Sequence, residues 1–311
     1  MSYNSSEKIL IIKHGALGDI IQGIDGFAAI RKGHPNAQIS LLTTAPFEGL
    51  VKAMPFFDHV LIDPRAKFWD IPALLKIRSI MKAGWTRIYD FQSSKRTKRY
   101  FKNLVPDSVE FVGVHEGVSH LIPDMTGINN RDRMVKTAEI GGCKEVDAPT
   151  DWLSADRPDV LPTGKYGVLI PGCSPAKPQK KWLGHEFAEV ADYLAEKGII
   201  PVLAGTNLDR QAGDDVLAHA NHVEKIIDMI GKTSLMGLAG MLRHADVVIG
   251  NDTGPVFLAA RLDAPTLMVM SGHTDPTMSA PYGKKASWIR RDDLNDLNAR
   301  DVIRVLEAEM L

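Results

Sequence analysis

The chain has little cysteine, almost no net charge and no long apolar segment. Two cysteines among 311 residues are too few for a disulfide framework, so we expect reduced thiols in a reducing compartment. A formal net charge of −1 gives no global attraction for nucleic acid or an anionic membrane. No apolar run approaches the roughly 20 residues that span a bilayer, and no signal-peptide segment opens the sequence. We therefore expect a cytoplasmic protein, at most attached peripherally to the inner face of the cytoplasmic membrane.

Several cofactor and catalytic signatures are also missing. The ten histidines and two cysteines show no metal-ligand spacing, so we expect no metal. Residues 231–233 lack the earlier glycine that a P-loop requires, and no G-x-S-x-G elbow occurs. The first strand is not followed by G-x-G-x-x-G, and no acid follows the second strand. A nicotinamide oxidoreductase is therefore the weakest of the enzyme classes.

What is present is an ordinary globular composition arranged as two α/β halves. Hydrophobic residues make up 44% of the chain and charged residues 24%, and the length suits two domains of about 150 residues. Short apolar runs alternate with helical patterns, which predicts parallel sheets joined by crossover helices. Strands are predicted at 8–13, 38–43, 59–62, 87–91, 109–114, 166–170, 199–204, 247–250 and 266–270, and helices at 19–33, 74–81, 186–197, 209–219, 235–244 and 299–309.

The proline-rich segment 145–165 interrupts this alternation and is predicted to link two domains, residues 1–150 and 151–311. The sequence thus predicts two doubly wound, Rossmann-like domains facing a cleft. Ligands of such sheets bind beyond the carboxyl ends of the strands.

The first candidate site residues follow the first predicted strand, in the small-residue turn 15–19 (GALGD). Gly18 allows a ligand to approach the backbone closely. Asp19 is placed to act as a general base on an acceptor hydroxyl. The alternative is that Asp19 only caps the helix that follows.

A second group of candidates lies in the other half and suits a nucleotide diphosphate. Asp252, Thr253 and Gly254 follow a predicted strand and open a helix, where free N–H groups favour an anion. Lys177 and Lys180 lie on a loop after another strand and can neutralise phosphate charge. The remaining candidate, Asp209, could hold ribose hydroxyls. Plain alternatives stay open: a helix cap at 252–255, a solvated loop at 177–181 and a lone surface acid at 209.

The strongest local basic patch is residues 95–102 (KRTKRYFK), which follows Gln92 at another strand end. A charged run is usually a solvated helix face. Its position beside a strand end also suits a phosphorylated acceptor or an anionic membrane surface. Nucleic acid is a poorer candidate, because the rest of the chain is not basic.

Taken together, these segments resemble glycosyltransferase family 9, the ADP-heptose:lipopolysaccharide heptosyltransferases. The similarity rests on ILIIKHGALGDII at 9–21, HPNA at 34–37, YDFQ at 89–92, KPQKKW at 177–182 and, most specifically, NDTGPVFLAARLDAPTLMVMSGHTDPTMSAPYG at 251–283.

The resemblance implies a GT-B fold and an inverting glycosyltransferase that needs no metal or other cofactor. Its co-substrate would be a nucleotide-diphosphate sugar, ADP-linked, carrying heptose or a similar sugar, and its acceptor a lipopolysaccharide core or related phosphorylated or lipid-linked glycan. The implied roles are Asp19 as base, with donor binding by Lys177, Lys180, Asp209, Asp252, Thr253 and Gly254, and acceptor binding by Gly18, Gln92, Lys95, Arg96, Lys98 and Arg99.

One position departs from the family pattern. The family commonly has His three residues after the glycine of D-T/S-G, where this chain has Phe257. Two alternatives therefore stay beside the transferase: a GT-B-like sugar-nucleotide epimerase or hydrolase, and a nucleotide-sugar-binding paralogue without catalysis.

Overall fold

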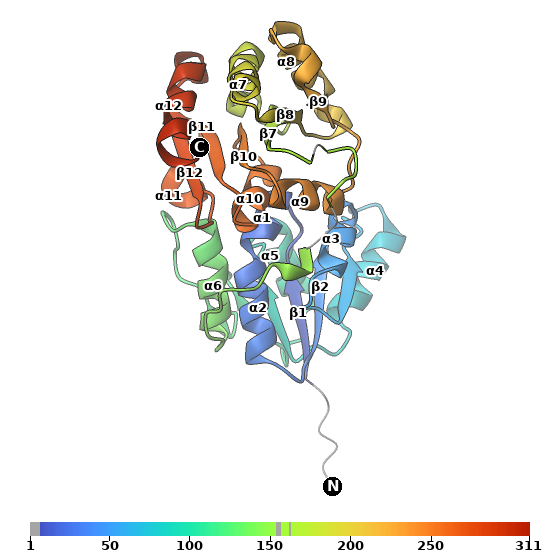
Figure 1. The fold of residues 1–311 in the computed structure, drawn as a ribbon. Coiled ribbons are helices and arrows are strands. Elements are labelled where there is room, and N and C mark those ends of the chain that lie inside the picture. Colours follow the sequence, from blue (N-terminus) through green and yellow to red (C-terminus); the bar gives the residue numbers. More distant parts are fainter. Residues whose placement is uncertain (1–6, 154–156, 162) are drawn as a thin grey trace. The chain divides into compact units, whose positions relative to one another are not determined.

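The computed structural model describes residues 7–153, 157–161 and 163–311. The chain forms two compact units, Met1–Trp152 and Leu153–Leu311, and each contains one six-stranded sheet (Figure 1). Every strand pairing in both sheets is parallel.

The first unit has the strand order β3-β2-β1-β4-β5-β6, the order of a dinucleotide-binding Rossmann sheet. Its strands are β1 (Lys8–Ile12), β2 (Gln38–Thr43), β3 (His59–Ile62), β4 (Arg87–Asp90), β5 (Glu110–Gly113) and β6 (His120–Leu121). Its helices are α1 (Leu17–Gln22), α2 (Ile24–Gly33), α3 (Glu48–Lys52), α4 (Ile71–Met81), α5 (Lys95–Leu104) and α6 (Asn130–Ile140).

The second unit repeats this topology, with the order β12-β11-β10-β7-β8-β9. Its strands are β7 (Tyr166–Ile170), β8 (Ile200–Leu203), β9 (Ile227–Asp228), β10 (Val247–Asn251), β11 (Thr266–Ser271) and β12 (Ala286–Arg291). Its helices are α7 (Gly184–Glu196), α8 (Arg210–His219), α9 (Leu235–Arg243), α10 (Gly254–Arg261), α11 (Pro276–Ser279) and α12 (Ala299–Glu309).

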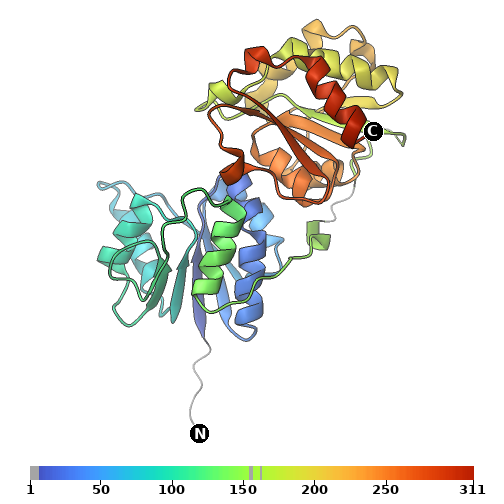
Figure 2. The ribbon, with the colours of Figure 1, turned by 90° about the vertical axis from the view of Figure 1, so that its left-hand side faces the viewer.

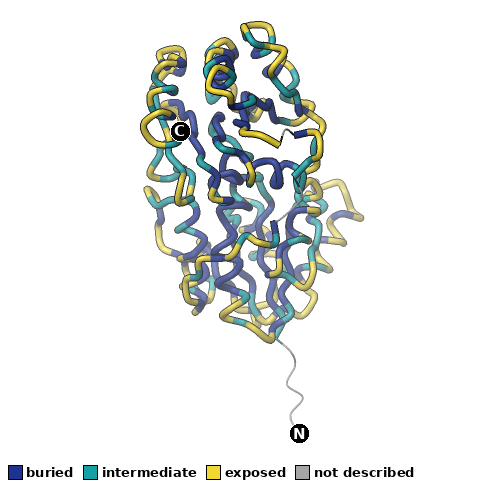
Figure 3. Tube along the Cα trace, in the orientation of Figure 1, coloured by how far each residue is buried: buried dark blue, intermediate teal, exposed yellow. Residues whose placement is uncertain are grey.

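The central strands are buried because helices cover both faces of each sheet (Figures 2 and 3). In the first unit, Leu10 of β1 packs with Ile77 of α4 and Tyr100 of α5. Ile88 of β4 belongs to the same cluster. Because side chains alternate along a strand, its neighbour Tyr89 points to the opposite face of the sheet. Its hydroxyl donates a hydrogen bond of 3.0 Å to the Gly141 carbonyl, just after α6.

Most predicted elements are present, with ends shifted by one to three residues, but some predictions are wrong. The helix expected to run unbroken to residue 33 is two helices: α1 ends at Gln22, Gly23 lies between them, and α2 begins at Ile24. The first sheet does not end at residue 114, since β6 follows β5. We did not predict α3, α6, α11, β6, β9 or β12 from the sequence.

The predicted linker 145–165 is partly ordered. Ala148 and Leu153 are buried, and a short 3-10 turn spans Asp151–Leu153. The division between the two units, after Trp152, falls inside this segment. Its residues 154–156 and 162 lie outside the described residues.

Candidate active site

Each sheet has one point at which the order of its strands reverses, between β1 and β4 in the first unit and between β7 and β10 in the second. Loops that leave the carboxyl ends of such neighbouring strands run in opposite directions, and the space between them is where ligands of this architecture bind. Most of the predicted site residues follow one of these four strands.

Asp19 lies in the first turn of α1, directly beyond β1, and is not a helix cap. The cap position belongs to Ala16, which makes no side-chain capping bond. Instead, the Asp19 Oδ1 accepts a 2.9 Å hydrogen bond from Asn130 Nδ2 at the start of α6. The side chain remains 39% exposed, so a substrate hydroxyl can reach it. The capping alternative is therefore wrong.

A buried lysine lies behind Asp19. Lys13 Nζ is 3.7 Å from Asp19 Oδ2, and its side chain is 5% exposed. Burial lowers the pKa of Lys13, and the nearby Asp19 and Asp90 carboxylates oppose this effect. The lysine and Asn130 together fix the Asp19 carboxylate from two sides.

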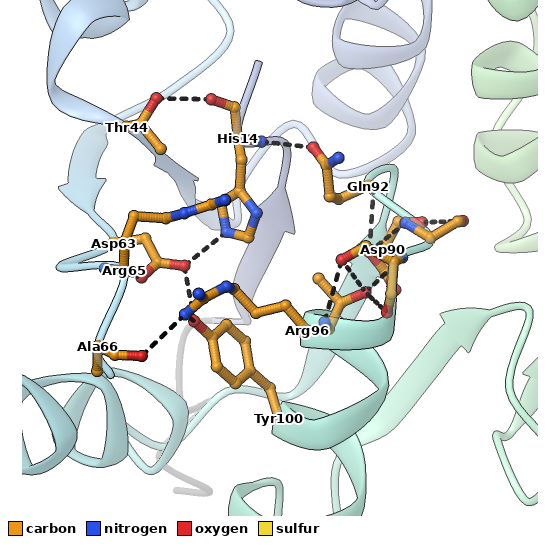
Figure 4. Close-up of polar contacts among 12 residues, drawn as sticks. His14, Thr44, Asp63, Arg65, Ala66, Asp90, Gln92, Arg96 and Tyr100 are labelled. Carbon is orange, nitrogen blue, oxygen red and sulfur yellow. Dashed lines mark hydrogen bonds and ion pairs between the residues drawn. The ribbon is translucent and has the colours of Figure 1, made fainter. Parts of the chain in front are cut away.

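The loop that carries Asp19 is anchored at His14 by a buried polar network (Figure 4). The His14 amide donates to Gln92 Oε1 (2.9 Å), across the reversal point between β1 and β4. Its Nε2 lies 2.8 Å from Asp63 Oδ2, which also accepts a 2.8 Å hydrogen bond from the Tyr100 hydroxyl. Next along the loop, Gly15 has φ +128°, and a Cβ there would lie 2.3 Å from the Phe47 ring. This packing fixes where α1 begins.

Some predicted acceptor-binding residues have internal partners in this network. Gln92 uses its side-chain oxygen on His14, and Gly18 is buried in the first turn of α1. Arg96 donates to the Ala66 carbonyl at 3.3 Å and to the Tyr100 hydroxyl at 3.4 Å. Burial raises the pKa of Tyr100 to about 12, so this hydroxyl keeps its proton at neutral pH.

The rest of the basic run is free for a ligand. Lys95, Lys98 and Arg99 are exposed on α5, and their side chains form no hydrogen bond or ion pair within the described residues. A capping box between Ser94 and Thr97 starts the helix. Lys102, the last residue of the run, is exposed as well, so the predicted patch divides into one structural arginine and four exposed cations.

In the second unit, the central pair is Lys180 and Asp252. The Lys180 ammonium contacts Asp252 Oδ2, and the Thr274 hydroxyl donates a 2.7 Å hydrogen bond to the same oxygen. The Asp252 side chain is 6% exposed and that of Lys180 is 13% exposed. An ammonium has three N–H donors, so Lys180 retains two for a ligand.

Asn251, the last residue of β10, holds the loops around this pair. Its Oδ1 accepts from the Trp182 amide at 3.0 Å, and its Nδ2 donates to the Pro171 carbonyl at 2.9 Å. Since Asn251 and Trp182 are both fully buried, they keep the end of β10 against the chain that follows β7. Lys180 and Asp252 lie on either side of this anchor.

The start of α10 offers an anion site beside this pair. Thr253 occupies the cap position but makes no side-chain capping bond. Within the described residues, the Gly254 amide has no hydrogen-bond acceptor, so it is open to a ligand. Phe257, one turn later, is 6% exposed and presents no polar group.

The two remaining donor candidates are less engaged. Lys177 is exposed, and its side chain forms no hydrogen bond or ion pair with a described residue. Asp209 caps its own turn, because its Oδ2 accepts hydrogen bonds of 2.8 Å from both the amide and the hydroxyl of Thr206. The other oxygen lies beside Gly172, where an added Cβ would be 2.1 Å away. One carboxylate oxygen of Asp209 is thus free to take a ligand.

Sequence reasoning missed four residues of these sites: Lys13, Asn130, Asn251 and Thr274. Lys13 directly follows β1 and Asn251 ends β10, and these positions at the ends of central strands could have indicated both residues. The contact between Asn130 and Asp19 joins residues 111 apart in the sequence, and nothing local indicates it.

The described residues contain neither a membrane-spanning helix nor a cluster of metal-binding side chains. No helix there is both long and apolar enough to span a bilayer. Across the same residues, no group of three or more His, Cys, Asp or Glu side chains is arranged to hold a metal ion.

Comparison with known proteins identifies the family. Residues 144–305 match the model of glycosyltransferase family 9 (heptosyltransferase). Lipooligosaccharide heptosyltransferase 2 of Haemophilus ducreyi is 31% identical, over 92% of this chain and 89% of that protein. A family 9 glycosyltransferase structure from Veillonella parvula superposes with a TM-score of 0.82 at 18% identity, covering 98% and 97% of the two chains.

An Escherichia coli heptosyltransferase, WaaC, whose structure was determined with ADP, superposes with a TM-score of 0.77 at 19% identity, covering 97% and 99%. These structural likenesses confirm the predicted GT-B fold, built from two Rossmann-like units. The chain belongs to glycosyltransferase family 9, the heptosyltransferase family, and is a glycosyltransferase.

Proposed function

We propose that this enzyme moves a heptose or similar sugar from an ADP-linked donor to a lipopolysaccharide core or related surface glycan, at the inner face of the cytoplasmic membrane. In this proposal the first unit holds the acceptor and the second unit holds the donor. The observation that carries it is the exposed Asp19 carboxylate, fixed by Asn130 and Lys13 where the strand order of the first sheet reverses.

Asp19 acts as the general base. It takes the proton from an acceptor hydroxyl, and the oxygen attacks the anomeric carbon of the donor as the bond to the diphosphate breaks. The bond electrons leave with ADP. A single displacement of this kind inverts the configuration at that carbon.

The second unit stabilises the leaving diphosphate through its own charges and amides. Two N–H donors of Lys180 remain beside Asp252, and Thr253 and Gly254 add a hydroxyl and an amide at the positive end of α10. Lys177 adds a mobile cation. The free oxygen of Asp209 takes a ribose hydroxyl. No step in this scheme requires a metal ion.

The acceptor side also supplies exposed cations on α5. Lys95, Lys98 and Arg99 are exposed at the start of α5, directly after the end of β4. Cations near a helix N-terminus are unfavourable to the helix by about 0.3–1 kcal/mol each. Their presence there is therefore better explained by an acidic or phosphorylated acceptor than by helix stability.

The decisive experiment is Asp19→Asn, assayed for ADP release and for glycan product with ADP-heptose and a heptose-deficient lipopolysaccharide acceptor. We expect kcat to fall by about a hundredfold or more, with folding retained, because general bases contribute on this scale. Asp107→Asn, on an exposed acid without described partners, is the matched control. Full turnover in Asp19→Asn, or ADP release that does not need the acceptor, contradicts the proposal.

Donor binding is tested separately by calorimetric titration with ADP, UDP and GDP. We expect selective ADP binding that weakens in Lys180→Ala and not in Lys181→Ala, a lysine on the same loop. No nucleotide binding at millimolar concentration would remove the proposed donor site while leaving the family assignment intact.

A further inference from the structure

A second carboxylate, fully buried, ends the strand beside β1. Asp90 is the last residue of β4, and its side chain is 0% exposed. In the first sheet β4 lies between β1 and β5, so the carboxyl ends of these three parallel strands are neighbours. Lys13 directly follows β1, and His115 comes two residues after the end of β5. In the row of strand ends, Asp90 therefore comes between a lysine and a histidine.

One oxygen of Asp90 holds the turn that follows β4 (Figure 4). Its Oδ1 accepts hydrogen bonds from the amides of Gln92 at 3.1 Å and Ser93 at 2.9 Å. Ser93 has φ +47°, in the left-handed region that residues other than glycine seldom adopt. An asparagine at position 90 would offer the same acceptor oxygen to both amides. The turn therefore does not explain why this buried residue carries a charge.

The other oxygen of Asp90 is buried and accepts no hydrogen bond from a described residue. His115 Nε2 lies 3.4 Å from this Oδ2. His115 is itself buried, and its ring stacks on Phe101 with 6.4 Å between the ring centres, so the histidine is fixed beside the carboxylate. A buried carboxylate oxygen without a full set of hydrogen bonds is costly. The charge of Asp90 thus requires a partner that gains from it.

That partner is Lys13. Its Nζ donates at 3.4 Å to the carbonyl of Phe91, the residue directly after Asp90. Burial lowers the pKa of Lys13, the carboxylates of Asp19 and Asp90 raise it, and Arg133 of α6 lowers it. Asp19 is 39% exposed, so water screens part of its charge, whereas the side chain of Asp90 is entirely out of water. The buried ammonium thus has one counterion at the surface and one inside the fold.

We propose that Asp90 is a positioning residue for the transfer reaction, which holds the Lys13 ammonium as a cation beside Asp19 throughout turnover. The inference rests on the proposed function, because it requires Asp19 to be the base. When Asp19 takes the proton of the acceptor hydroxyl, its own charge is neutralised, and Asp90 is the carboxylate that still balances Lys13. Without Asp90, proton transfer would leave a buried ammonium without a counterion, which is strongly unfavourable. The proton transfer would therefore be slower.

The test is the pH dependence of kcat in Asp90→Asn, measured with the full-length enzyme and both substrates. Asparagine keeps the acceptor oxygen for the amides of Gln92 and Ser93, so the turn should still form. Since one of the two carboxylates that oppose burial is gone, the pKa of Lys13 should fall further. We expect kcat about tenfold below wild type, an unchanged KM for the donor, and an alkaline limb of the kcat profile at lower pH than in wild type.

Further variants show whether Asp90 acts through Lys13. In Lys13→Met, adding Asp90→Asn should not lower kcat again, because the cation that Asp90 balances is already absent. If Asp90→Asn does not fold, Asp90→Ser removes the same charge, keeps a hydroxyl for the turn and should move the alkaline limb in the same direction. The matched control is Asp192→Asn in α7, since Asp192 is also buried and also accepts from two backbone amides, those of Asn221 and His222. It should leave the alkaline limb unchanged.

The outcomes separate this inference from the proposed function. If Asp19→Asn is inactive while Asp90→Asn keeps the wild-type alkaline limb, Asp19 is the base and the inference about Asp90 is wrong. It is also wrong if the losses from Lys13→Met and Asp90→Asn multiply in the double variant, because Asp90 then acts without Lys13. If Asp19→Asn keeps full turnover, the proposed function fails, and the inference fails with it. A lower kcat with a shifted limb, and no added loss in the double variant, supports both.

Discussion

Asn130 should set the position of the Asp19 carboxylate, the proposed base, and the structure predicts how much the removal of Asn130 matters. In Asn130→Ala, Asp19 loses the 2.9 Å hydrogen bond to its Oδ1. Hydrogen bonds to charged groups are worth about 1.5–3 kcal/mol. Asp19 is 39% exposed, so water replaces part of that interaction. We therefore expect the lower end, about 1.5 kcal/mol, which is about tenfold in rate.

The assay is steady-state kinetics with both substrates varied. A group that only positions the base should lower kcat and leave the KM for the donor unchanged. Asn295→Ala is the matched control, since it removes a similar 2.9 Å bond between an Asn amide and a carboxylate, that of Asp293. Thermal denaturation checks that α6 still folds. A kcat within about twofold of wild type, when Asp19→Asn is inactive, would refute this role for Asn130.

Three further results are expected. Burial lowers the folded-state pKa of Lys13 below 10.5, so between the folded and the unfolded pKa values the unfolded chain binds more protons. The free energy of unfolding should therefore rise with pH in that window, and Lys13→Met should abolish this rise, measured as the denaturation midpoint against pH. Burial alone would raise the pKa of Asp63, but hydrogen bonds from His14 and other donors lower it below 3.8. Asp63→Asn should therefore destabilise the protein at neutral pH by about 1–3 kcal/mol, and this difference should shrink when the denaturation midpoint is measured at pH values below 3.8. Gly15→Ala should lower the free energy of unfolding by about 1–3 kcal/mol in denaturant melts, and adding Phe47→Ala should recover part of that loss, because it removes the clash and leaves the unfavourable φ. If nothing is recovered, the whole loss comes from the backbone conformation.

The sequence was sufficient to predict the central strands and the strand ends that the candidate site residues follow. Those strands are continuous apolar runs, buried on both faces, and such runs are hard to mistake when helices separate them. The positions of Asp19, Asp252 and Thr253 followed from the same rule, because each comes directly after a strand next to a reversal of strand order.

The elements that escaped prediction lack a regular pattern. β6 and β9 are two residues long. The buried face of α6 includes Arg131 and Thr137 among its apolar residues, which breaks the helical period of hydrophobicity. Gly23 divides α1 from α2 without any local polar signal.

The partners of the site residues could not be predicted for a different reason. The bond between Lys180 and Asp252 joins residues 72 apart, and that between Asn130 and Asp19 joins residues 111 apart. Which loops meet depends on strand order, and a single sequence shows the strands without showing their order. Similarly, the basic run 95–102 gave no sign that Arg96 alone would be turned inward by Ala66 and Tyr100.

The segment that leaves the first unit is fastened to the residue that follows Asn130. Arg131 donates from Nη1 to Glu145 at 2.7 Å and from Nε to Asp25 at 2.7 Å, and Asp25 in turn accepts from the Ala148 amide at 3.0 Å. Hydrogen bonds to Arg131 and Asp25 thus hold this connecting segment at the first turn of α6. The residue directly before Arg131 is Asn130, whose amide donates to the Asp19 carboxylate, so the same turn of α6 holds both the connecting segment and the proposed base.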